Sequence, residues 1–222
     1  MSDPVVARPA STVLLVRSNN GLEVLMVQRP ARGFFGGLMV FPGGAVEPCD
    51  VDRARTEGGD QDFRIAGLRE TAEEVGVAVT PSGHIVSPRL RGAELLGEVA
   101  AGEGWGTNRM TLVSRWITPR MAPKRFDTRF YLVPIDGDPE IRLDPGELVG
   151  HSWVSPGQAL RNHATGDWAM ILPTLSHLRW LERRSTIAEA VFAASGADGL
   201  TIVEPIEDEQ ELLVRYRGED ED

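Results

Sequence analysis

A stretch with helical periodicity, FRIAGLRETAEEVGV, restricts the fold more than any other part of the sequence. Leu68, Ala72 and Val75 recur at positions i, i+4 and i+7, which places them on one face of a helix. Gly76 follows where a glycine commonly ends a helix. We therefore expect a helix at about residues 63–75, with its apolar face against a core.

The same helix carries three glutamates within five positions, Glu70, Glu73 and Glu74. At 100° per residue they share the face opposite the apolar residues, where like charges at i, i+3 and i+4 repel one another. One interpretation is an ordinary solvated helix face, with Arg69 offsetting part of the repulsion. The other is a site for a divalent cation, since Mg²⁺ prefers hard oxygen ligands such as carboxylates. The spacing alone leaves both open.

Strand patterns and helix patterns alternate along the rest of the chain. Two apolar runs flank a turn at Ser18-Asn19-Asn20-Gly21 and predict a β-hairpin. TLVSRWITP and TRFYLVPI indicate strands, whereas GAELLGEVAAG, PGQALRNHATG and STIAEAVFAASG indicate helices. We predict one mixed α/β domain over residues 10–216, with a helical extension from about residue 160 and flexible tails at 1–9 and 217–222.

Composition excludes several classes of function. The net charge of −10 argues against sequence-independent nucleic-acid binding, which needs a basic surface. The apolar run Val13–Val16 is too short for a membrane span or a signal peptide, so no membrane partner is expected. Cys49 is the single cysteine and cannot form an intramolecular disulfide, which favours a reducing compartment. We expect a cytoplasmic protein.

The glutamate-bearing helix and the loop before it resemble the signature of the Nudix hydrolase family, G-x5-E-x7-R-E-U-x-E-E-x-G-U, in which U is a bulky apolar residue. RETAEEVGV matches its second half, except that Thr71 stands at the first U. In the first half, five residues separate Gly44 from Asp50, an acid where the signature has glutamate. Eighteen residues then precede Arg69 instead of seven, so the loop carries an insertion of eleven. The sequence is similar to the family over roughly residues 10–160.

The resemblance implies an α/β/α sandwich with a mixed β-sheet and a site for Mg²⁺ or Mn²⁺. Glu70, Glu73 and Glu74 would be metal ligands, with the backbone carbonyl of Gly43 or Gly44, in the turn Pro42-Gly43-Gly44, as a further ligand. Arg69 would orient the carboxylates, and Asp50 or Glu47 would contribute at the other end of the loop. The general base varies within the family. Our candidate for a base or a further ligand is Glu147, which is equally consistent with a solvated loop acid.

The family resemblance also implies the reaction and the substrate class. Nudix enzymes hydrolyse a diphosphate that links a nucleoside to another group, so the expected partner is a small nucleotide diphosphate. QRPARGFFGGLMVFPGGAVEPCD and KRFDTRFYLVPI resemble the branch with coenzyme A diphosphatases, and Arg29 and Arg125 become candidates for phosphate contacts, with Gly43 and Gly44 beside the substrate. ADP-ribose, NADH or nucleoside triphosphates are alternative substrates, and a non-catalytic nucleotide-binding regulator is an alternative of another class. A homodimer is a further expectation from the family.

Overall fold

A tight hairpin begins the central sheet, as the sequence predicts. The computed structural model describes residues 5–32, 36–55, 60–120, 122–196 and 201–203. Strands β1 (Arg8–Ser18) and β2 (Leu22–Gln28) pair antiparallel up to Ser18 opposite Leu22. Between them Asn20 has φ 54° and Gly21 has φ 136°, values that favour asparagine and glycine in short hairpin turns.

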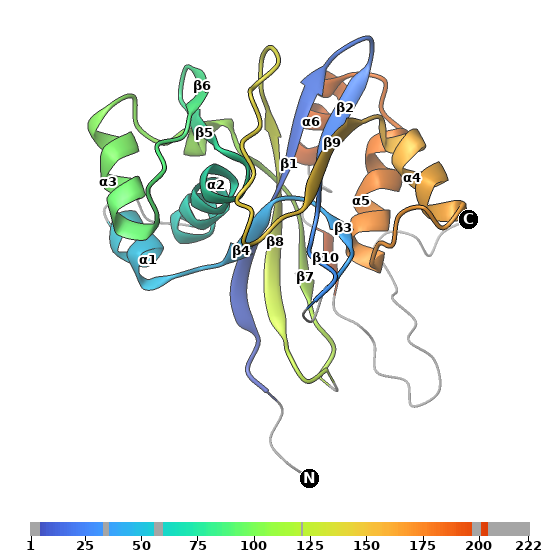
Figure 1. Ribbon diagram of the computed structural model, residues 1–222, viewed down its shortest axis with the longest axis horizontal. Coiled ribbons are helices and arrows are strands. Elements are labelled where there is room, and N and C mark those ends of the chain that lie inside the picture. The colour runs from blue at the N-terminus through green and yellow to red at the C-terminus, as the bar shows by residue number, and fades with distance from the viewer. Residues whose placement is uncertain (1–4, 33–35, 56–59, 121, 197–200, 204–222) are drawn as a thin grey trace.

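The sheet is mixed, because β1 has a parallel neighbour on one side and antiparallel neighbours on the other. It pairs parallel with β8, with Leu14 opposite Leu132, and antiparallel with β2 and β4. The strands run in the order β10-β7-β8-β1-β2-β3, with β4 paired to β1 and β9 paired to β2 (Figure 1). The remaining strands are β3 (Met39–Val40), β4 (Gly43–Ala45), β7 (Thr111–Ile117), β8 (Phe126–Pro134), β9 (Gly150–Val154) and β10 (Thr201–Val203), and β5 (Val77–Thr80) pairs with β6 (Gly83–Val86) in a separate hairpin.

Helices cover both faces of the sheet, which confirms the predicted α/β/α sandwich (Figure 1). Alternate residues of β1 point to opposite faces. Val13 and Leu15 pack in one core with Leu68 of helix α2, whereas Leu14 and Val16 pack in a second core with Leu178 of helix α5. The helices are α1 (Pro48–Ala54), α2 (Gln61–Val75) and α3 (Gly92–Ala101) on the first side, α4 (Pro156–Ala164), α5 (Leu172–Glu182) and α6 (Ile187–Ser195) on the second, and a 3₁₀ turn at Thr107–Arg109 precedes β7.

Two segments differ from the sequence-based expectation. β1 begins at Arg8, so it includes the last two residues of the segment predicted as an N-terminal tail. The sequence places Gly43 and Gly44 in a turn, but in the structure they lie in β4, opposite Thr12 and Ser11 of β1. The predicted tail at 217–222 lies outside the described residues. No helix in the described ranges has the length and apolar character required to cross a bilayer.

A buried polar chain joins α5 to the sheet. Trp116 Nε1 donates to Ser114 Oγ at 3.1 Å, and Ser114 Oγ lies 2.7 Å from His177 Nε2. His177 Nδ1 lies 2.6 Å from the carbonyl oxygen of Pro173. Because that carbonyl can only accept, Nδ1 carries the proton and Nε2 accepts from Ser114. The imidazole stacks on Phe130 and is neutral, since burial lowers the pKa of His177 to about 4.

This arrangement predicts a loss of stability in acid that depends on His177. In the unfolded chain the imidazole takes up a proton near pH 6.5, whereas the folded protein resists protonation down to about pH 4. The stability that the neutral imidazole of His177 contributes is therefore fully present above about pH 6.5. As the pH falls towards 4, the free energy of unfolding decreases by about 3 kcal/mol. Urea unfolding of the protein and of His177→Gln should show a difference in unfolding free energy that narrows by this amount between pH 7 and pH 4. If the difference in unfolding free energy were the same at pH 7 and pH 4, His177 would not be held in its neutral form by the fold.

Candidate active site

Helix α2 places the three glutamates in a covered position and not on a solvated face. The side chains of Glu70, Glu73 and Glu74 are only 13%, 7% and 1% exposed. The helix ends at Gly76, which has φ 75° and donates its N–H to the carbonyl of Ala72, as the sequence predicts. The apolar face of α2 is buried as expected, and the opposite face lies under β4 and the segments before α3 and β9.

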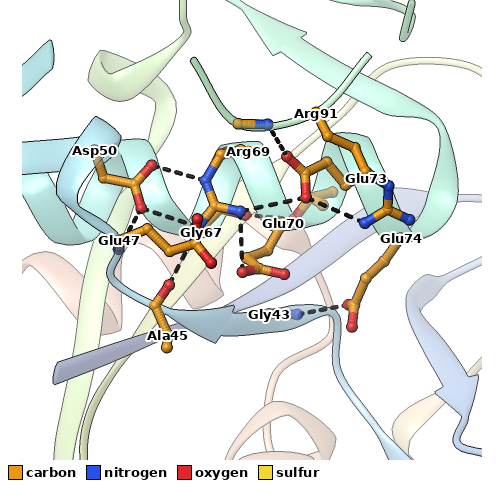
Figure 2. A network of polar contacts seen from close by, with 12 residues as sticks. Gly43, Ala45, Glu47, Asp50, Gly67, Arg69, Glu70, Glu73, Glu74 and Arg91 are labelled. Carbon is orange, nitrogen blue, oxygen red and sulfur yellow. Dashed lines mark hydrogen bonds and ion pairs between the residues drawn. The ribbon is translucent and has the colours of Figure 1, made fainter. Parts of the chain in front are cut away.

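Two glycines of β4 allow the strand to lie directly against these carboxylates. A Cβ atom on Gly44 would stand 2.4 Å from Cδ of Glu70. Gly43 has φ 149°, and its N–H donates to Glu74 Oε2 at 2.9 Å (Figure 2). Any larger residue at position 44 would displace the Glu70 carboxylate. The two glycines predicted to lie near the site therefore do so. Gly43 contacts Glu74 through its backbone N–H, and Gly44 leaves room for the Glu70 carboxylate because it has no side chain.

Three carboxylates converge at one point. Oxygen atoms of Glu70, Glu74 and Glu147 all lie within 4.8 Å of one another. Glu147 comes from the segment before β9, 73 residues after Glu74, so the fold brings together residues that are distant in sequence. Arg29, at the end of β2, donates to Glu74 Oε1 at 3.1 Å and to the carbonyl of Gly43 at 3.3 Å. The fold thus brings five predicted site residues together at one place: Glu70, Glu74, Glu147, Arg29 and Gly43.

The environment of this group opposes its negative charge. Burial raises the pKa of Glu74 to about 8, and the guanidinium of Arg29 only partly offsets that effect. Burial also raises the pKa of Glu70 to about 7, and the neighbouring Glu73 and Glu147 carboxylates raise it further against the opposing effect of Arg69. A divalent cation would remove this penalty, since hard oxygen atoms are its preferred ligands. The three residues therefore fit a divalent metal ion.

Glu73 lies outside that group, although the sequence predicted it as a ligand. Its Oε1 accepts from the backbone N–H of Gly92 at 2.7 Å, and its Oε2 lies 3.3 Å from Arg69 and 3.6 Å from Arg91. Arg125, predicted to contact phosphate, donates to the carbonyls of Thr118 at 3.1 Å and Val5 at 2.6 Å. Within the described part of the chain, no contact joins Arg125 to the carboxylates.

The sequence profile of the NUDIX domain matches residues 7–172, three quarters of the chain. The chain belongs to the Nudix family. It is 28% identical over 193 residues to nudix hydrolase 7 of Caenorhabditis elegans, which covers 79% of this chain and 61% of that protein. It is 23% identical over 243 residues to the human acyl-coenzyme A diphosphatase NUDT19, covering 76% of this chain and 63% of that protein. The chain thus spans about three fifths of the length of these relatives.

A solved Nudix structure confirms the architecture. The crystal structure of a Nudix hydrolase from Alicyclobacillus acidocaldarius has a TM-score of 0.74 to this chain at 28% identity. The match covers 84% of this chain and 96% of the other. The mixed sheet between two helical layers is therefore the Nudix fold, as the resemblance implied.

The Nudix signature is closed by an ion pair between its two halves. Arg69 Nε and Nη2 donate to the two oxygens of Asp50 at 2.8 and 2.9 Å, and both side chains are at most 2% exposed (Figure 2). The other nitrogen, Nη1, lies 3.1 Å from Glu70 and 3.3 Å from Glu73. Of the two acids expected at this end of the loop, Asp50 forms the ion pair with Arg69, whereas Glu47 donates its backbone N–H to Asp50 at 2.8 Å.

Sequence reasoning missed two residues that hold the site together. Arg91 contacts Glu73, Asp144 and Glu147 with one guanidinium group. Asp144 donates its backbone N–H to the carbonyl of Glu74 at 3.0 Å. Neither residue lies in the Nudix signature, and their only signal in the sequence is a charged residue next to a predicted helix or turn.

The Asp50–Arg69 pair predicts a large loss of stability in Asp50→Ala. That substitution would leave the guanidinium of Arg69 buried without its bidentate partner, which costs about 3–5 kcal/mol. Asp52→Ala in the same helix is the matched control, because the side chain of Asp52 is 64% exposed and its pair with Arg55 lies on the surface. It should change the unfolding free energy by less than about 0.5 kcal/mol. Equal effects of the two substitutions in urea unfolding would contradict the structural role of Asp50.

Proposed function

We propose that this Nudix protein hydrolyses the pyrophosphate bond of a nucleoside diphosphate linked to a second group. The observation that carries the proposal is the convergence of Glu70, Glu74 and Glu147 within 4.8 Å at the end of the signature helix. A regulator that only binds a nucleotide has no need of three buried or half-buried carboxylates at one point. The arrangement instead fits a reaction in which negative charge on phosphate oxygens must be neutralised.

Glu70, Glu74 and Glu147 would hold Mg²⁺ or Mn²⁺. When bound, such an ion neutralises phosphate charge and lowers the pKa of a coordinated water. Arg29 is proposed to contact a phosphate oxygen, since its guanidinium already reaches the Glu74 carboxylate at 3.1 Å. β4 excludes water from one side of the carboxylates, because Gly43 and Gly44 allow its backbone to lie against Glu74 and Glu70. Arg125 stays a prediction as a phosphate contact.

We propose coenzyme A or its acyl esters as the substrate. The proposal rests on the segments QRPARGFFGGLMVFPGG and KRFDTRFYLVPI and on the similarity to the human acyl-coenzyme A diphosphatase. ADP-ribose, NADH and nucleoside triphosphates are the competing substrates. Incubation of the purified protein with each compound and Mg²⁺, followed by mass spectrometry of the products, distinguishes them. Cleavage of coenzyme A at its diphosphate supports the proposal, and turnover of ADP-ribose or NADH alone would overturn this choice of substrate. Nucleotide binding without turnover of any of them would identify a regulator.

Replacing one ligand tests the site directly. Glu74→Gln keeps the shape of the side chain and an oxygen that can accept from the Gly43 N–H, but it removes the negative charge. We expect turnover to fall by about 100-fold or more, because metal-ion catalysis supplies several kcal/mol of transition-state stabilisation. Glu98→Gln, an exposed glutamate of α3, is the control and should retain full activity. Steady-state rates with Mg²⁺ give the comparison, and circular dichroism verifies that both variants are folded. Normal Mg²⁺-dependent activity of Glu74→Gln would exclude Glu74 as a ligand.

The raised pKa values of Glu70 and Glu74 predict that metal binding releases protons. At pH 6 both carboxyls hold a proton for most of the time, because their pKa values are about 7 and about 8. A metal ion requires the ionised form, so the affinity for Mn²⁺ should rise with pH and level off above about pH 8. Calorimetric titrations in buffers of different ionisation enthalpy measure both the affinity and the protons released. A Mn²⁺ affinity that stays constant from pH 6 to pH 9 would contradict the prediction.

A further inference from the structure

The segment that carries Glu147 is attached to the end of α2 through its backbone. Arg142 donates its N–H to the carbonyl of Val75 at 2.9 Å, and Asp144 donates to the carbonyl of Glu74 at 3.0 Å. The N–H of Leu148 donates to the carbonyl of Asp144 at 2.9 Å. These bonds place the backbone of Glu147 near the other carboxylates. They leave the direction of its side chain open, since that side chain is 40% exposed.

Arg91 supplies the contact that directs this side chain. Its Nη1 lies 3.0 Å from Glu147 Oε1 and 3.6 Å from Glu73, and its Nη2 pairs with Asp144. One guanidinium therefore links the Glu147 segment to α2. The backbone next to Arg91 is fixed as well, because the N–H of Gly92 donates to Glu73 Oε1 at 2.7 Å.

The charge of Arg91 also reduces the repulsion that Glu147 meets. Glu147 has to lie beside Glu70 and Glu74, whose ionised, metal-binding forms carry the same charge, and Arg91 is the cation in direct contact with Glu147 among the described residues. The side chain of Arg91 is 52% exposed, and exposed ion pairs contribute little to the stability of a fold. Its contacts with three carboxylates from two segments are therefore of more consequence for the placement of Glu147 than for folding.

We infer that Arg91 is a positioning residue, which holds the Glu147 carboxylate beside Glu70 and Glu74 so that all three can bind one divalent ion. The inference rests on the metal site of the proposed function and adds a residue outside the Nudix signature. Without Arg91, the exposed Glu147 side chain would turn towards solvent, away from the like charges, and the ion would lose a ligand. Arg91 itself touches neither the ion nor the substrate in this role.

Binding of Mn²⁺ without substrate tests the inference independently of hydrolysis. In titrations followed by electron paramagnetic resonance, Arg91→Gln should raise the Kd for Mn²⁺ about tenfold, the loss typical when a group that orients a ligand is removed. Arg91→Lys should recover part of the affinity, because an ammonium supplies the charge but cannot reach three carboxylates. Arg142→Gln is the matched control, since Arg142 lines the same cavity of about 380 Å³ as Arg91 but pairs with Glu140. It should bind Mn²⁺ as the unaltered protein does.

A double-mutant cycle identifies the route of the effect. If Arg91 acts through Glu147, then Arg91→Gln should change the Kd less than twofold in a Glu147→Gln background. Chemical rescue gives a second readout that a purely structural role would not produce. Arg91 lines a cavity with room for a small cation, so guanidinium at concentrations far below those that unfold proteins should restore Mn²⁺ binding to Arg91→Ala. The same concentration of sodium chloride should not.

The outcomes separate this inference from the proposed function. Unchanged Mn²⁺ affinity in Arg91→Gln, or an equal loss in Arg142→Gln, would overturn the role of Arg91 while leaving the metal site intact. A full tenfold effect of Arg91→Gln in the Glu147→Gln background would overturn it as well. If the unaltered protein binds Mn²⁺ but cleaves no diphosphate, the proposed function fails and the effect of Arg91 is still measured. Failure of the unaltered protein to bind Mn²⁺ would overturn both.

Discussion

The close approach of helix α2 to the sheet is the constraint on which the site depends. At Gly67 a Cβ atom would lie 2.5 Å from Oγ of Ser11 in β1, and at Gly44 a Cβ atom would lie 2.4 Å from Glu70. At these two contacts between α2 and the strands, one glycine belongs to the helix (Gly67) and the other to a strand (Gly44). This contact buries Glu74 almost completely and gives its carboxylate a backbone N–H, that of Gly43, as a fixed donor. With a longer distance between α2 and β4, the carboxylates would be solvated and would not be held in fixed positions around a cation.

Burial of several carboxylates at one place requires cations, and the fold provides them from separate segments. Arg69 comes from α2 itself, Arg29 from the end of β2 and Arg91 from the segment before α3. Each guanidinium contacts its own set of carboxylates, and Arg69 and Arg91 share Glu73. Arg69 also contacts Asp50 and Glu70, Arg29 contacts Glu74, and Arg91 also contacts Asp144 and Glu147. The group Glu70, Glu74 and Glu147 nevertheless keeps raised pKa values at its first two members. The arginines thus orient the carboxylates without fully stabilising their ionised forms, and a divalent ion would supply the positive charge that is still lacking.

Local sequence patterns predicted the helices, the strands and much of the site. They could not predict contacts between segments that are distant in the sequence. The periodicity of Leu68, Ala72 and Val75 predicted α2, because a helix with one apolar face has to pack that face on a core. Periodicity could not show that the opposite face is covered too, since the covering segments are distant in sequence. The signature implied Glu73 as a ligand, and this stays a prediction: its carboxylate contacts Arg69, Arg91 and the Gly92 N–H and lies outside the group of Glu70, Glu74 and Glu147. The only signal of Arg91 was its place before a predicted helix, which is common for an arginine, and its three partners come together only in the fold.

The position of the insertion explains why the signature tolerates it. The spacing from Gly44 to Asp50 matches the family pattern, and the sequence from Arg69 to Val77 matches it except at Thr71, so the eleven extra residues lie between Asp50 and Arg69. These two residues form the buried bidentate pair that joins the halves of the signature. The pair closes the loop at its base, so the length of the chain between them does not change the geometry at either end. Because the entropic cost of closing a loop grows only slowly with its length, extra residues between Asp50 and Arg69 lower the free energy of unfolding only slightly. Helix α1 begins two residues before Asp50, continues to Ala54 and contacts α2 and α3, so the first residues after Asp50 pack beside the helix that carries Arg69.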